Sequence, residues 1–159
     1  MKVDVLILLG WMLALSSGLM AGVYLAFSSF IIRSLASLGA GPAVVAMNAI
    51  NTHILRSAFM PLFFGSTLIA LMLVAAGLWR WGSVDATVAV VAGGIYALGM
   101  FGVTAALNVP LNNMLARVAG DGVEAEAAWS VYRSRWTRWN TVRTVASIVT
   151  LILCVWLIV

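Results

Sequence analysis

The chain has 159 residues, of which 64% are hydrophobic and only 9% are charged, whereas soluble domains carry about 25% charged residues. So little polar surface cannot cover a soluble globule, and the composition predicts an integral membrane protein whose length suits one domain over residues 1–159. The net charge of +4 comes mainly from Arg residues that flank the apolar stretches. This placement suits anionic membrane lipid and argues against a nucleic-acid partner.

Four apolar stretches follow one another along the chain, at about residues 5–32, 58–79, 86–109 and 140–159. About 20 apolar residues are needed to cross a bilayer, and the fourth stretch reaches that length only if residues 141–144 enter the bilayer edge. Lipid cannot satisfy backbone polar groups, so each stretch is predicted to be a helix. The expected fold is all-α, an up-and-down four-helix bundle in a membrane.

The first stretch has a rival interpretation as a signal peptide, because Lys2 precedes it. Its apolar run continues unbroken to Ile32, however, and the apolar core of a signal peptide is only about 7–15 residues long. We therefore expect a membrane span. Within it, Gly18 and Gly22 are four residues apart, a spacing that permits close packing of helices.

The connections between the stretches differ in length. Residues 80–85 form a tight turn, whereas residues 34–57 include a predicted short helix at 43–55, and residues 111–138 include a break at 120–122. Both long connections lie on one side of the predicted bundle, which also carries most of the positive charge. By the positive-inside rule this side is predicted to be cytoplasmic in a bacterial inner membrane, with both termini outside. Its arginines are Arg33, Arg56, Arg117, Arg133, Arg135 and Arg138, against Lys2 and Arg80 on the other side.

An aromatic and polar stripe leads into the fourth span. On one continuous helix its six residues fall within an arc of about 100°, with Ser134 and Arg138 on the opposite face. An Asn and an Arg at the start of a membrane helix are costly unless they are paired, so the stripe is a functional hypothesis. Its members are Trp129, Tyr132, Trp136, Trp139, Asn140 and Arg143.

Antiparallel threading brings further polar residues to the same end of the bundle, where Pro110 is expected to bend the third helix. One interpretation is a polar, Trp-walled pocket; the alternative is an interfacial belt of aromatic residues with snorkelling arginines. His53, the only histidine, is either a general base or a structural residue, and the lone Cys154 is expected to fill space. The polar residues are Ser28, Asn48, Asn51, His53, Arg56, Asn108, Asn112 and Asn113.

Several motifs in this chain resemble the anthrone oxygenase-like membrane family. They are Phe27–Ser28, Met47-x-x-Ile50–Asn51, the run from Asn108 to Asn113, and Trp129-x-x-Tyr132-x-x-x-Trp136-Thr137-x-Trp139–Asn140-x-x-Arg143. They occur in the family's order over nearly the whole chain, and the last motif is the specific one. Many relatives carry a His where this chain has Thr141.

The resemblance implies cofactor-free oxygenation of a planar polycyclic phenol, of the anthrone-to-anthraquinone type. On this hypothesis Asn140, Arg143 and His53 are catalytic. The substrate-binding residues would be Trp129, Tyr132, Trp136, Trp139, Asn108, Asn112, Asn51, Phe27 and Ser28.

Two other classes of function stay open: a module that binds a lipid, a quinone or another hydrophobic ligand without turnover, and a structural membrane subunit. We expect a hydrophobic or aromatic small molecule and membrane lipid as partners, and the sequence leaves a homo-oligomer open. With one His, one Cys and no carboxylate in the predicted spans, no metal site is expected, and no nucleotide-binding motif is present.

Overall fold

The computed structural model describes residues 4–119 and 122–159, and in this part of the chain every regular element is helical. Four continuous helical columns are long and apolar enough to cross a membrane: Val5–Ala36, Phe59–Trp79, Val84–Leu115 and Gly122–Ile158. The predicted all-α membrane bundle is therefore confirmed. Lys2, and all of the 120–122 break except Gly122, lie outside the described residues.

The first column consists of α1 (Val5–Ala26), the π-helical segment η1 (Phe27–Ile31) and α2 (Ile32–Ala36). Asp4 caps α1, because its Oδ1 accepts a hydrogen bond of 2.9 Å from the Leu6 N–H. This bond, together with the nearby Arg80 guanidinium, lowers the pKa of the Asp4 carboxyl. Asp4 and Arg80 also form an ion pair, which ties the start of α1 to the turn after the second span.

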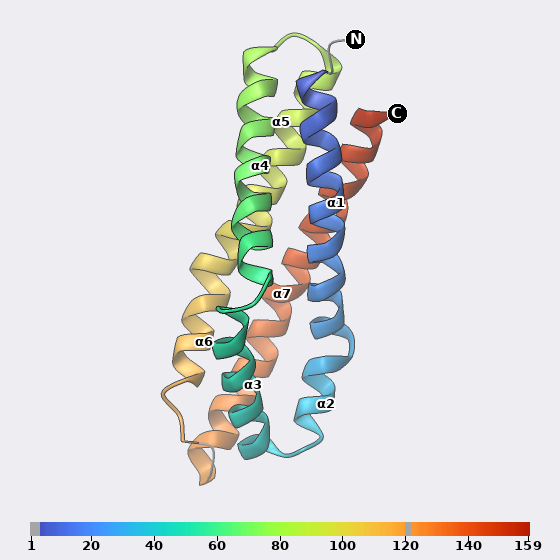
Figure 1. Cartoon of the computed structure of the whole chain (residues 1–159). Helices are drawn as coiled ribbons and strands as arrows, with labels where there is room; N and C mark the ends of the chain where they lie inside the picture. The colour runs from blue at the N-terminus through green and yellow to red at the C-terminus, as the bar shows by residue number, and fades with distance from the viewer. Residues whose placement is uncertain (1–3, 120–121) are drawn as a thin grey trace.

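The predicted short helix is α3 (Ala40–Ile54), and it stands upright beneath α4 (Phe59–Trp79) (Figure 1). At about 1.5 Å per residue, the 15 residues of α3 and the 21 of α4 add up to roughly 54 Å. The 37 residues of α7 (Gly122–Ile158) are about as long, roughly 55 Å. The two shorter helices thus fill one side of the bundle, and the helical structure is interrupted between them at about half the height of the bundle.

The third column passes through α5 (Val84–Tyr96), η2 (Ala97–Gly102), η3 (Thr104–Asn108) and α6 (Val109–Leu115). The column continues beyond Pro110 to Leu115, further than the predicted end at residue 109. Proline is tolerated here because it lies in the first turn of α6. The backbone irregularity precedes the proline, where two π-helical segments replace regular α-helix.

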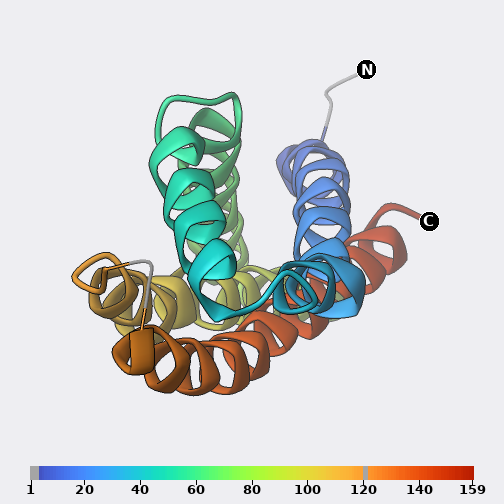
Figure 2. The same cartoon turned by 90° about the horizontal axis from the view of Figure 1, so that it is seen from below.

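Two hydrophobic cores lie one above the other. The upper core packs α1, α4, α5 and the end of α7, and it includes Leu13, Leu73 and Tyr96. The lower core packs α2, α3, α6 and the start of α7 around Met47 and Tyr132. Seen from below, α7 runs along one side of the bundle, with α3 and α4 stacked opposite it (Figure 2). The break between α3 and α4 falls where the two cores meet.

Candidate functional site

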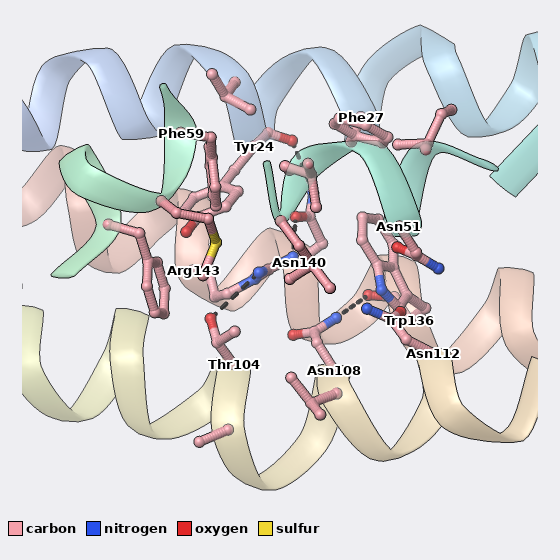
Figure 3. Close-up of a pocket in the computed structure, with 18 of the residues that line it drawn as sticks. Tyr24, Phe27, Asn51, Phe59, Thr104, Asn108, Asn112, Trp136, Asn140 and Arg143 are labelled. Atoms are coloured by element: carbon pink, nitrogen blue, oxygen red, sulfur yellow. Dashed lines mark hydrogen bonds between the residues drawn. The ribbon is translucent and has the colours of Figure 1, made fainter. Parts of the chain in front are cut away.

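A cavity of about 300 Å³ lies at the junction of the two cores, and we call it the central cavity. Its volume is at the lower end of the range of about 300–1,000 Å³ that is usual for small-molecule sites. Every column of the bundle contributes to its wall, and most of the wall is apolar (Figure 3). The lining residues include Tyr24, Phe27, Asn51, Phe59, Phe63, Phe101, Thr104, Asn108, Asn112, Trp136, Asn140 and Arg143.

Among the described residues, Arg143 is the only charged one that lines the central cavity, and only 5% of its surface is exposed. Its Nη2 donates to Asn140 Oδ1 over 2.6 Å, and its Nη1 donates to Thr104 Oγ1 over 3.2 Å. The guanidinium carbon also lies 4.2 Å from the ring centre of Tyr24 and 5.3 Å from that of Trp136. All of these partners are neutral. Arg143 thus faces the bundle interior and is paired, as the cost of an isolated charge requires, with Asn140 and Thr104.

Asn140 fixes the position of that guanidinium. Its side chain is fully buried, and its Nδ2 donates both to the Tyr24 carbonyl and to Ser28 Oγ, each over 2.7 Å. Both Nδ2 hydrogens are thus used within the protein, and Oδ1 is used by Arg143. Asn140 therefore orients Arg143 and joins α7 to α1, and it has no hydrogen left for a ligand.

The three π-helical segments all lie at the level of the central cavity. Phe27 is the first residue of η1, Phe101 belongs to η2, and Thr104 and Asn108 belong to η3. Asn108 Nδ2 donates to the Trp136 carbonyl over 3.2 Å. A π-helical turn redirects side chains and alters the backbone hydrogen bonds, and such turns are frequent at functional sites. Here they aim polar groups of two columns at α7.

Phe27 and Trp136 form the lower wall, and further aromatic rings pack behind Trp136. The ring centres of Tyr132 and Trp136 are 5.8 Å apart, and those of Phe27 and Trp136 are 5.6 Å apart. Trp129 stacks on Tyr132 from below, and the Tyr132 hydroxyl donates to Asn112 Oδ1 over 2.9 Å. The Trp136 ring thus faces the cavity and is supported by the rings behind it.

Several buried polar atoms at the cavity have no hydrogen-bond partner in the described part of the chain. Three are donors, namely Asn51 Nδ2, Trp136 Nε1 and Arg143 Nε, and one is the acceptor Asn108 Oδ1. An unpaired buried donor costs about 1–3 kcal/mol. Such a set is therefore expected where a ligand supplies the missing partners, and its excess of donors favours a ligand with accepting oxygens.

The remaining predicted site residues lie outside the cavity wall. His53 is exposed, and its Nδ1 is hydrogen-bonded to the Ala49 carbonyl one turn earlier. Trp139 is half-buried beside the Arg138 guanidinium. Ser28 contacts Asn140 behind the wall, while Trp129 and Tyr132 belong to the lower core. Of the predicted stripe, only Trp136, Asn140 and Arg143 reach the cavity.

Sequence reasoning missed the residues opposite α7. Tyr24 gives both a ring face to Arg143 and a carbonyl to Asn140, and Thr104 gives a hydroxyl. Phe59, Phe63 and Phe101 complete the upper wall. The available signal was weak: Tyr24 and Thr104 are polar residues inside otherwise apolar spans, four residues before Ser28 and before Asn108, respectively.

The central cavity opens at the side of the bundle. Val23, Leu55 and Phe64 line it and are 36%, 64% and 55% exposed. These residues lie on α1, at the end of α3 and on α4, around the break between α3 and α4. The opening is therefore bordered by exposed apolar side chains.

Comparison with known proteins gives one match. The family model described as anthrone oxygenase matches residues 52–153, which is more than half of the chain and includes the motif from Trp129 to Arg143. No curated protein and no solved structure matches the chain.

Proposed function

The chain belongs to the anthrone oxygenase family, and from this premise we propose that the central cavity binds a planar polycyclic phenol and promotes its oxidation by dioxygen. The substrate class is that of an anthrone, and the product is the corresponding anthraquinone. The observation that carries the proposal is the buried Arg143 in an aromatic-walled cavity, with unpaired donors on both Arg143 and Trp136.

The overall reaction is anthrone plus dioxygen to anthraquinone plus water. The substrate's ring methylene loses a proton, and the resulting delocalised anion transfers one electron to dioxygen. The carbon radical and superoxide then combine, which forms a carbon–oxygen bond and a peroxide anion. The peroxide takes up a proton, the remaining hydrogen leaves the same carbon, and the oxygen–oxygen bond breaks to release water and leave a carbonyl group. Dioxygen is the only oxidant required.

The chain's own residues have distinct tasks in this proposal. The Trp136 ring gives the ligand an aromatic wall, supported by Phe27 and Tyr132. Arg143 stabilises negative charge on the substrate oxygen and on the peroxide, which lowers the barrier most in a site that excludes water. Asn140 is a positioning residue, because it holds the guanidinium in place through Oδ1. Phe59 and Phe63 keep the upper side apolar.

An oxygen electrode with detergent-purified protein and several anthrones tests the proposal. We expect oxygen uptake above the spontaneous rate, with one dioxygen consumed for each anthraquinone formed. In the described residues no three His, Cys, Asp or Glu side chains lie close enough to hold a metal ion, so chelators should not slow uptake. The proposed reaction uses dioxygen as its oxidant, so uptake should need no added flavin or nicotinamide. Arg143→Leu should abolish the enzymatic uptake, and Arg138→Leu, on the opposite face, should retain it.

Anthrone binding without any uptake above background would instead favour a non-catalytic binding protein for quinones or lipids. Uptake that stops on chelation would contradict the cofactor-free reaction. The lateral opening supports a substrate that partitions into the membrane, since Leu55 and Phe64 at its rim are both apolar and exposed.

For the membrane orientation, we propose that the arginine-rich end is cytoplasmic in a bacterial inner membrane. Arg33, Arg117 and Arg133 lie at this end, on α2, after α6 and on the lower part of α7. In a Cys154→Ala background, a cysteine introduced at Ser83 should be labelled from outside intact cells, and one introduced at Ser37 should not. The reverse labelling pattern would contradict the orientation.

A further inference from the structure

The central cavity carries a positive charge that has no negative partner within residues 4–119 and 122–159. The side-chain hydrogen bonds and the ring contacts of Arg143 all go to neutral groups. Among the described residues the only ion pair is Asp4–Arg80, at the far end of the bundle. A buried cation without a counter-ion carries a large desolvation penalty, so the apo protein holds Arg143 at a cost that an anionic ligand would relieve.

The nearest acidic residues along α7 do not reach this charge. Glu126 precedes Arg143 by 17 positions on one continuous helix, which corresponds to about 26 Å at 1.5 Å per residue. Asp85 lies in the first turn of α5, beside the tight turn at the other end of the bundle. No carboxylate occurs among the residues that line the cavity.

In the part of the chain that the structure describes, the cavity also has no group that is suited to take up a substrate proton. The titratable groups that α1 and α7 contribute to the wall are Tyr24 and Arg143. Tyr132 of α7 lies behind the wall, and Tyr96 of α5 donates a hydrogen bond to Ser66. The residues that α4, η2, η3 and α6 contribute to the wall are not titratable. The one titratable residue near the cavity on α3 is His53, which is exposed and bonded to a backbone carbonyl.

From these observations we infer that the central cavity takes its ligand as an anion, with the ionised oxygen of a planar phenol or enol paired to Arg143 and the proton released to bulk water. Arg143 Nε and Trp136 Nε1 are both hydrogen-bond donors without a partner among the described residues. An anionic oxygen is the acceptor that forms the strongest hydrogen bonds with such donors. This inference rests on the proposed function for the planar aromatic shape of the ligand. It adds the ionisation state of the ligand and assigns the driving force for ionisation to Arg143.

A hydroxyanthraquinone dye tests the inference, because its colour reports ionisation and it has no ring methylene to oxidise. The absorbance of the dye is titrated against pH with wild-type protein and in protein-free micelles of the same detergent. The protein should lower the apparent pKa of the bound dye by at least about one unit, and dye affinity should rise as the pH increases toward that value. Unsubstituted anthraquinone, which has the same ring system but no ionisable group, should bind equally at every pH.

Three outcomes would overturn the inference: a bound dye whose pKa equals or exceeds that in micelles, no dye binding at any pH, or displacement of the dye by a saturated fatty acid with equal affinity. Arg143→Met should remove the pKa shift, whereas Arg143→Lys should retain part of it and Arg138→Met all of it. If Arg143→Met is not monodisperse, the wild-type comparison of dye with anthraquinone still decides the question.

The dye readout is independent of turnover, so it separates this inference from the proposed oxygenase. A lowered dye pKa without anthrone oxidation would keep the anion site and refute the oxygenase. Anthrone oxidation with an unshifted dye pKa would support the oxygenase and refute the anion site.

Discussion

Asn140→Asp is the sharpest perturbation of the central cavity, because it changes the charge beside Arg143 with almost no change in shape. Asn140 Oδ1 already lies 2.6 Å from Arg143 Nη2, so a carboxylate at this position would pair with the guanidinium directly. The substitution thus supplies inside the protein the counter-ion that we assign to the ligand.

The expected magnitude follows from Coulomb's law. A ligand anion about 4 Å from the guanidinium gains about 4 kcal/mol at an effective dielectric constant near 20, which corresponds to a ligand pKa lowered by about 3. A carboxylate about 6 Å from the same anion repels it by about 3 kcal/mol. Asn140→Asp should therefore cut the lowering of the dye pKa to about one or less.

The dye titration described above measures this change, and Asn140→Ala is the matched control. Alanine removes the hydrogen bonds to the Tyr24 carbonyl and Ser28, as aspartate does in part, but it leaves the charge of Arg143 uncompensated. We expect the alanine variant to keep more of the pKa lowering than the aspartate variant, because the charge of Arg143 remains and Thr104 still binds the guanidinium. The electrostatic argument is refuted if the two variants shift the dye pKa equally.

Three further predictions concern neighbouring features. Trp136→Phe keeps a ring but removes the unpaired indole N–H. Dye affinity should fall at least about tenfold in equilibrium binding, since a hydrogen bond to a charged group contributes about 1.5–3 kcal/mol. The control variant Trp139→Phe should bind the dye like wild type. His53→Ala should leave oxygen uptake unchanged, because this side chain is exposed and lies outside the cavity wall; a loss of rate would restore it as a base. Gly93→Ala should destabilise the protein by about 1–3 kcal/mol in thermal unfolding, because an added Cβ would lie 2.5 Å from a carbonyl oxygen of α4, whereas Gly22→Ala, which meets nothing within 4 Å, should not.

The helices could be predicted because their signals are local. Apolar length predicts each span, and the absence of Gly and Pro between Trp129 and Val159 predicts that the stripe and the fourth span form one helix. The predicted connection 111–138 is wrong in extent, because α6 continues to Leu115 and α7 already begins at Gly122. The same helical geometry correctly placed Trp136, Asn140 and Arg143 on one buried face, with Arg138 on the exposed face.

The partners of this face could not be predicted, because they depend on how the columns meet. Tyr24 and Thr104 contact Arg143 from two other columns, next to or within π-helical segments that no periodic pattern indicates. His53 is only two residues from Asn51 in the sequence, but residues two apart on a helix point in directions that differ by about 200°. The structure accordingly places Asn51 on the cavity wall and turns His53 outward.

The π-helical turns give this fold a way to change its binding specificity by insertion and deletion of single residues. Each such turn holds about one residue more than a regular helical turn. Because the turn absorbs the extra residue, deleting one residue within Phe27–Ile31 would restore regular helix while α1 and α2 kept nearly the same rotation relative to each other. Tyr24 would stay against Asn140 and Ile32 would stay in the lower core, so only the side chains that the turn itself presents would change. A change of one residue in length at such a turn can therefore alter the cavity wall without repacking the two cores.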